Sequence, residues 1–265
     1  MKTSQQVTPW WGTFNFDHTH SKIWQIGPLT MIVRCLYDEW LISYERREVF
    51  EDSDISITDT DVLPETLAEL SRYVFRKTTG ILNITPLLAD RSVVSRPLTP
   101  FNLTAGEEVT LYVGSPLWLE LTAGSNRKKL GEICIQRPSD TWFGTSTREG
   151  ELCYATTSRC RINLHDTPER IHRAITPVTI CNNADTTLSV ERLILPSPML
   201  SIFKSSDGLL WTSSVKLIRE KDGDMAALKV THKPPAEADN AVVLSKPRIA
   251  TEKGILIRAF NAVFS

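Results

Sequence analysis

The stretch PVTICNNADTTLSVERLILP, Pro177 to Pro196, has the pattern of two β-strands joined by a turn. An apolar run enters the Asn-rich segment 182–185, and a second run with alternating apolar residues leaves it. Asn and Asp favour tight turns, and alternation with a period of two is typical of strands. The stretch therefore predicts a β-hairpin. Ser206-Asp207-Gly208, also flanked by apolar runs, predicts a second one.

Similar short apolar runs continue outward in both directions, separated by turn residues. ILNITPLL, SVVSRPLTPF, EEVTLYV and PLWLELTAG precede the opening stretch, and MAALKVTHK and KGILIRAF follow it. Pro97, Pro100 and Pro116 mark strand edges, because proline cannot donate a hydrogen bond to a sheet. Many short strands with closely spaced turns are typical of β-sandwiches, and the opening stretch is similar to the strand-turn-strand unit of immunoglobulin-like modules.

One segment has helical rather than strand spacing. In PETLAELSRYVF, residues 64–75, Pro64 suits the first turn of a helix, and Leu67, Leu70 and Val74 share one helical face. Its last three residues suit a strand equally well, so the segment could also bend from helix into strand. The sequence thus predicts an all-β protein of two β-sandwich (immunoglobulin-like) domains with one short helix.

The predicted division follows a polar, turn-rich region near the middle of the chain. A run of six polar residues, GSNRKK at 124–129, and the loop-rich stretch after residue 138 favour a boundary there. We therefore expect an N-terminal β domain over residues 1–135 and a C-terminal immunoglobulin-like β-sandwich domain over residues 136–265. The 265 residues are enough for two domains of ordinary size.

Charge and hydropathy exclude several classes of partner. Thirty basic and 31 acidic residues leave a formal charge of −1, so no overall field attracts nucleic acid. The N-terminal segment MKTSQQVTPWWGTFNF lacks the apolar core of an export signal, and no apolar run is long enough to insert into a membrane. Five scattered cysteines do not resemble a disulfide framework. We therefore expect a cytoplasmic protein.

His18 and His20 are the most metal-like local pair. On a strand they would share a face, where two imidazoles could bind one zinc ion. A third ligand is missing nearby, so a polar strand end is the favoured interpretation and we expect no metal site.

The stretch SDTWFGTSTREGELCYAT, Ser139 to Thr156, carries the other candidate residues. Trp142 and Phe143 lie in a turn and are candidates for binding a partner, since aromatic side chains are enriched at interfaces. Asp140, Glu149 and Glu151 are the alternative: paired carboxylates could hydrolyse a carbohydrate-like substrate if they met across a cleft.

No further motif indicates catalysis. The chain lacks a G-x-S-x-G nucleophile turn and both glycine-rich phosphate loops, so we expect no cofactor. Cys153 and Cys160 are seven residues apart, which is not a redox spacing, and buried structural thiols are favoured over nucleophiles.

Four segments together resemble one known family: GEEVTLYVGSPLWLEL, SDTWFG with EGELCYA, ITPVTICNNADTTLSVERLILP and DGLLWTSSV. The chain from about Pro97 to Val215 is similar to a bacterial and archaeal family of uncharacterised proteins, domain of unknown function 432. The resemblance implies an accessory role beside a membrane channel, and it brings no catalytic residue with it.

The sequence as a whole favours a non-catalytic binding or assembly module. Its seven tryptophans exceed what a core alone needs, and sandwich edges commonly pair. We expect a protein partner or self-association.

Overall fold

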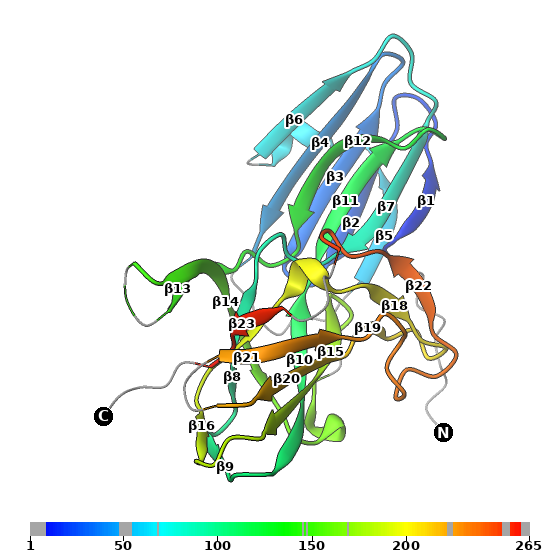
Figure 1. The fold of residues 1–265 in the computed structure, drawn as a ribbon. Helices are drawn as coiled ribbons and strands as arrows, with labels where there is room; N and C mark the ends of the chain where they lie inside the picture. The colour runs from blue at the N-terminus through cyan, green and yellow to red at the C-terminus, as the bar shows by residue number, and fades with distance from the viewer. Residues whose placement is uncertain are drawn as a thin grey trace. The chain divides into compact units, whose positions relative to one another are not determined.

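The computed structural model describes residues 9–47, 55–67, 69–144, 146, 148–168, 170–221, 225–250 and 255–260. The N-terminal segment in which we expect no export signal lies partly outside these ranges. Over the described residues the helical elements are three-residue 3₁₀ turns, at Pro64–Thr66, Leu164–Asp166 and Ser197–Met199. The predicted all-β class is confirmed (Figure 1). Within the described part, no helix has the length and apolar character needed to cross a membrane.

The chain separates into two compact units, and each is built from two segments. The first unit contains residues 1–87 and 117–136, and the second contains 88–116 and 137–265. The boundary predicted between residues 135 and 136 falls beside the last junction. Residues 88–116 lie in the second unit.

The first unit holds two antiparallel sheets. One has five strands in the order β5-β2-β3-β4-β6, and the other has four in the order β1-β7-β11-β12. In chain order these strands are β1 (Gly12–Asn15), β2 (Ser21–Ile26), β3 (Leu29–Cys35), β4 (Glu39–Arg46), β5 (Ile55–Thr60), β6 (Glu69–Val74), β7 (Ile81–Leu87), β11 (Trp118–Ala123) and β12 (Lys128–Cys134).

Aromatic side chains join these two sheets. Phe14 on β1 packs edge-on against Trp24 on β2, with ring centroids 5.2 Å apart. Phe16, just after β1, contacts both Trp24 and Trp40, and all three are buried. Since β1 and β2 belong to different sheets, the rings form a core between two facing layers, as in a β-sandwich.

A helix over the whole of residues 64–75 is wrong, and the alternative of a bend from helix into strand is confirmed. A single 3₁₀ turn occupies Pro64–Thr66, and Glu69–Val74 then forms β6, which pairs with β4 along six residues. Leu70 and Val74 are 40% and 74% exposed. Pairing with β4 satisfies the backbone hydrogen bonds of this segment.

The second unit holds the remaining strands in three sheets. Their orders are β22-β18-β19-β15-β20-β21-β23 with β10 also paired to β15, then β13-β14-β8-β17, and finally β16-β9. The strands are β8 (Val93–Pro97), β9 (Phe101–Leu103), β10 (Glu108–Pro116), β13 (Ser139–Gly144), β14 (Gly150–Cys160), β15 (Arg173–Asn182), β16 (Leu188–Val190), β17 (Leu193–Leu195), β18 (Ile202–Lys204), β19 (Leu210–Thr212), β20 (Val215–Arg219), β21 (Met225–Val230), β22 (Val242–Ser245) and β23 (Leu256–Arg258).

Strand β15 is central to the largest sheet. It pairs antiparallel with β10 and parallel with β19 and β20, and nearly all its residues are buried. Its apolar residues suit such burial, and the buried polar side chains of Arg173, Thr176 and Asn182 make hydrogen bonds. The immunoglobulin-like topology stays a prediction.

The two predicted hairpins had different outcomes. The hairpin around Ser206-Asp207-Gly208 is confirmed, because β18 and β19 pair antiparallel across it. The one around 182–185 is wrong: β15 and β16 pair with other strands. Asn182 is fully buried, and its carboxamide nitrogen donates to the carbonyls of Leu103, Thr104 and Thr186. It joins separate loops instead of turning the chain.

Candidate anion-binding site

Three arginines lie side by side on neighbouring strands of the second unit. β8 lies between β14 and β17, and its parallel register with β14 pairs Arg96 with Arg159. Its antiparallel register with β17 pairs Ser95 with Leu193, so Arg192, one residue before β17, comes beside Arg96. Side chains in register on adjacent strands project from the same face. The fold therefore gathers three guanidinium groups on one face.

These arginines line a single open pocket of about 320 Å³. Its other lining residues are Glu191, Pro97, Leu98 and Pro100. The two prolines restrict the backbone, and Ser95 and Leu193, next to the arginines in sequence, are fully buried. The main chain that carries the charges is thus anchored in the core. We call this site the arginine pocket.

The arginine pocket has a surplus of positive charge. Three guanidinium groups and one carboxylate give a formal charge of 3 − 1 = +2. Arg159 Nη1 donates to the carbonyl of Leu98 at 3.2 Å. Within the described chain, the side chains of Arg96, Arg192 and Glu191 make no hydrogen bond or ion pair. Like charges opposite one another destabilise a sheet, so the arrangement favours a bound anion.

A second open pocket, of about 230 Å³ and with a mixed apolar and polar lining, adjoins the arginine pocket and shares Pro97 and Leu98 with it. Phe101, Leu111 and Ile162 contribute to its lining, together with Cys160. Burial raises the pKa of the Cys160 thiol to about 11. This thiol therefore stays protonated near neutral pH and is no activated nucleophile.

Comparison with known proteins identifies the family. A family model described as "Protein of unknown function (DUF432)" matches residues 10–265. The chain belongs to the DUF432 family. The match begins far upstream of Pro97, so it includes the N-terminal residues that the sequence resemblance left out, and both units. No curated protein and no solved structure matches the chain.

In this DUF432 chain the hairpin β13–β14 separates the candidate carboxylates. Asp140 lies opposite Tyr154, and Glu151 lies opposite Phe143, at positions of opposite parity in the register. Asp140 and Glu151 therefore project from opposite faces of the hairpin. Asp140 pairs with Arg91 at 3.2 Å, and Glu149 lies 3.9 Å from Arg258. The structure does not bring these three carboxylates into one site.

The burial of Glu151 has a local effect. Partial burial of the carboxyl group raises the pKa of Glu151, although the residue as a whole is exposed. Burial, followed by the charge of Glu151, raises the pKa of the neighbouring Cys153 thiol to about 12. Cys153 is thus a structural thiol.

The aromatic pair in the same hairpin is divided between core and surface. Phe143 is 1% exposed and packs with Val94, Cys153 and Ile194. Trp142 is 44% exposed, and its indole nitrogen donates to the carbonyl of Ser146 at 2.8 Å. Both residues lie on β13, not in the predicted turn, and of the two only Trp142 is exposed at the surface.

His18 and His20 lie in the turn between β1 and β2, and Thr19 between them has a left-handed φ of 75°. They are not on a strand, so the alternation assumed for them does not apply. The ring of His18 stacks on Tyr37 with centroids 4.4 Å apart. In the described ranges, no group of three or more His, Cys, Asp and Glu side chains is arranged to hold a metal ion.

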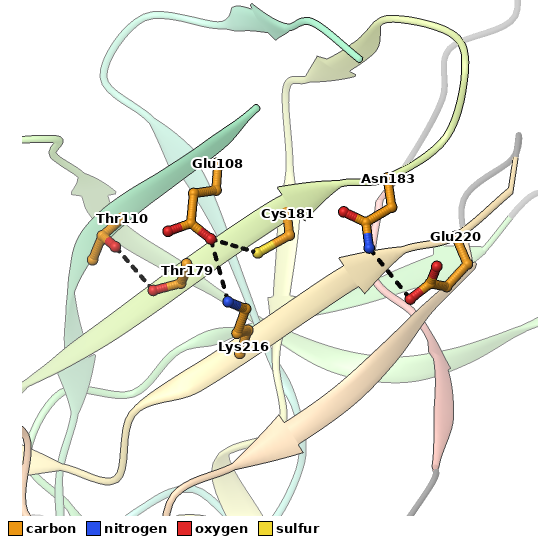
Figure 2. Close-up of polar contacts among 7 residues, drawn as sticks. All are labelled: Glu108, Thr110, Thr179, Cys181, Asn183, Lys216 and Glu220. Atoms are coloured by element: carbon orange, nitrogen blue, oxygen red, sulfur yellow. Dashed lines mark hydrogen bonds and ion pairs between the residues drawn. The ribbon is translucent and has the colours of Figure 1, made fainter. Parts of the chain in front are cut away.

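A second polar cluster crosses β10, β15 and β20, as Figure 2 shows. Glu108 Oε2 accepts hydrogen bonds from Cys181 Sγ at 3.1 Å and from Lys216 Nζ at 3.2 Å. These two bonds lower the pKa of Glu108. Burial, followed by the bond to Glu108, raises the pKa of Cys181. These bonds join three adjacent strands, so the cluster helps to fix their register.

Sequence patterns did not indicate the arginine pocket. The three arginines are separated by 33 or more positions, since they stand at 96, 159 and 192, and each is embedded in an ordinary strand pattern. The parallel pairing of β8 with β14 brings two of them together. Only the strand register could have revealed the site.

Proposed function

We propose that this chain is a non-catalytic binding module whose arginine pocket recognises an oxyanion of phosphate size. The observation that supports the proposal is the row of Arg96 on β8, Arg159 on β14 and Arg192 directly before β17. Guanidinium groups donate several hydrogen bonds in a fixed plane, which suits phosphoryl oxygens.

The lining of the arginine pocket supports binding rather than chemistry. It consists of three arginines, one glutamate, two prolines and one leucine. None of these seven residues is a nucleophile of the Ser, Cys or His type. Arginine stays protonated in proteins and so cannot act as a general base, and Glu191, the lining group that could, has no Ser, Cys or His side chain beside it in the lining.

Removing one arginine tests the proposal. Arg96→Gln and Arg192→Gln each remove one charge from the pocket, and Arg137→Gln removes one from an exposed arginine of the same unit outside it. We expect each pocket variant to raise the dissociation constant for inorganic phosphate roughly tenfold or more, as for the loss of a charged hydrogen bond. Isothermal titration calorimetry at constant ionic strength measures this constant.

Arg137→Gln should bind phosphate like the unmodified protein. If all three variants bound phosphate equally more weakly than the unmodified protein, phosphate binding would depend on overall charge. This result would contradict the role proposed for the arginine pocket. No measurable binding to the unmodified protein would also overturn the proposal.

Association with a protein partner or with a second copy, the accessory role beside a membrane channel and the cytoplasmic location stay predictions. Exposed Trp142 supports an association surface. Light scattering tests self-association directly, and a strict monomer at all concentrations would contradict it.

A further inference from the structure

We propose that Glu191 makes the arginine pocket selective for an oxyanion that carries a hydroxyl hydrogen. Hydrogen phosphate has such a hydrogen, whereas sulfate and fully ionised phosphate esters do not. This inference rests on the proposed function, because it names the ligand that the arginine pocket prefers.

Glu191 lies where its carboxylate can contact an anion bound in the arginine pocket. It precedes Arg192 in sequence, lines the same pocket as the three arginines and is partly exposed. In the region that the structure describes, it forms no ion pair with any of them. Its carboxylate therefore remains available to whatever the arginines bind.

A carboxylate distinguishes an anion that has a hydroxyl group from one that does not. An ionised carboxylate accepts hydrogen bonds and donates none. Facing a bare oxyanion oxygen, Glu191 places two negative groups together, and like-charge contacts in an interface are costly. Facing a P–OH group, it accepts a hydrogen bond that is strengthened by its charge. Glu191 thus disfavours the binding of an oxyanion without a hydroxyl group and favours the binding of one that has a hydroxyl group, although both carry the same charge.

The net charge of the pocket agrees with such a ligand. Three arginines and Glu191 leave +2, which matches a dianion. Hydrogen phosphate is a dianion with one remaining hydrogen. It is therefore the simplest ligand that satisfies both the arginines and the carboxylate.

Three probes of equal charge test the inference. At about pH 8 hydrogen phosphate, sulfate and methyl phosphate are all dianions, since a phosphate monoester loses its second proton near pH 6. Only hydrogen phosphate keeps a hydroxyl. We expect the full-length protein to bind it roughly tenfold more tightly than the other two, because these meet the like charge of Glu191. Calorimetry at matched ionic strength gives the three dissociation constants.

Glu191→Gln isolates the role of the carboxylate. The amide removes the charge but keeps an oxygen acceptor, so sulfate and methyl phosphate should bind roughly tenfold more tightly and hydrogen phosphate should change much less. Glu107→Gln is the matched control, because Glu107 is an exposed glutamate of the second unit outside the pocket. It should leave all three constants unchanged.

The outcomes separate the two proposals. If all three dianions bind equally and Arg96→Gln weakens each, the arginine pocket stands and the selectivity is overturned. If Glu191→Gln strengthens all three by the same factor, Glu191 only reduces the charge of the pocket, which also overturns the selectivity. If no dianion binds, the proposed function itself fails.

Discussion

At the residue scale, Asn182 shows how one side chain can hold several loops. Its nitrogen donates to three carbonyls at 2.9 to 3.1 Å, and its oxygen accepts from Arg219 Nη1 at 3.1 Å. Arg219 is 5% exposed and also donates to the carbonyl of Thr186. The ends of β15 and β20 and the loops beside them therefore depend on one carboxamide.

Asn182→Ala should be strongly destabilising. The substitution removes the carboxamide donor from the carbonyls of Leu103 and Thr104 and removes one acceptor of Arg219, which keeps its bonds to Thr186. Each buried group left unsatisfied costs about 1–3 kcal/mol. We expect the free energy of unfolding to fall by about 3 kcal/mol or more in a urea titration.

The next residue provides the control. Asn183 is exposed, and its nitrogen makes one long contact of 3.5 Å with Glu220. Asn183→Ala should change the free energy of unfolding by less than about 0.5 kcal/mol. Similar losses in both variants would contradict the role given to Asn182.

The sequence indicated Asn182 as a turn residue because asparagine favours turns. What it could not indicate is where the carboxamide points. An asparagine side chain can cap a turn close to it in sequence. When the fold buries it, the same carboxamide can instead donate hydrogen bonds to carbonyls that are distant in sequence. The arginine pocket shows the same limit, since Arg96 and Arg159 meet only through a register set by tertiary structure.

At the element scale, local chemistry predicted strands well and pairing partners less well. The β18–β19 hairpin formed as expected because Gly208 adopts a left-handed φ of 90° and Asp207 Oδ1 accepts from the amide of Leu209. These interactions are local. The segment Glu69–Val74 became a strand because the edge of β4 was open to it, which is a tertiary effect.

The hairpin β13–β14 depends on two glycines that face each other. Gly144 and Gly150 form the last pair of its register. A Cβ atom at Gly144 would overlap the backbone of Glu149 and lie 2.5 Å from the Cα of Gly150. Backbone atoms cannot give way as a flexible side chain can.

Gly144→Ala should therefore cost about 1–3 kcal/mol of unfolding free energy, as for an overpacked site. Gly106→Ala is the comparison: a Cβ there meets nothing within 4 Å, and only its left-handed φ of 78° opposes the change, at about 1 kcal/mol. Urea titration of both variants measures the difference. A smaller loss for Gly144→Ala would show that the hairpin relaxes around the methyl group.

At the scale of the whole molecule, the two units are interleaved along the chain. Residues 88–116 leave the first unit between β7 and β11, and residues 117–136 return to it. The composition of a sequence can indicate a domain boundary. It cannot indicate that strands on the two sides of an inserted segment pair with each other. The second unit needs β8 and β10, because β14 pairs with β8 and β15 pairs with β10.

A fragment of residues 136–265 should therefore fail to fold. A chain that joins residues 88–116 to residues 137–265 should fold, since the omitted hairpin has close ends: the Ile135 amide donates to the carbonyl of Leu117 at 3.0 Å. A short Gly-Ser linker can span that gap. Near-UV circular dichroism and cooperative urea unfolding distinguish the two constructions. A cooperatively folded 136–265 fragment would contradict the interleaved division.

The interleaving also sets the order in which a nascent chain can mature on the ribosome. The strands β2, β3, β4 and β6 lie within one short segment, so their sheet needs only local contacts and can form early. β7 emerges soon afterwards, yet its partner β11 follows only after all of residues 88–116 have been synthesised. During that interval one edge of β7 is open to foreign strands. We expect chaperone contact during synthesis to concentrate on Ile81–Leu87 and to end when the β11–β12 hairpin is released.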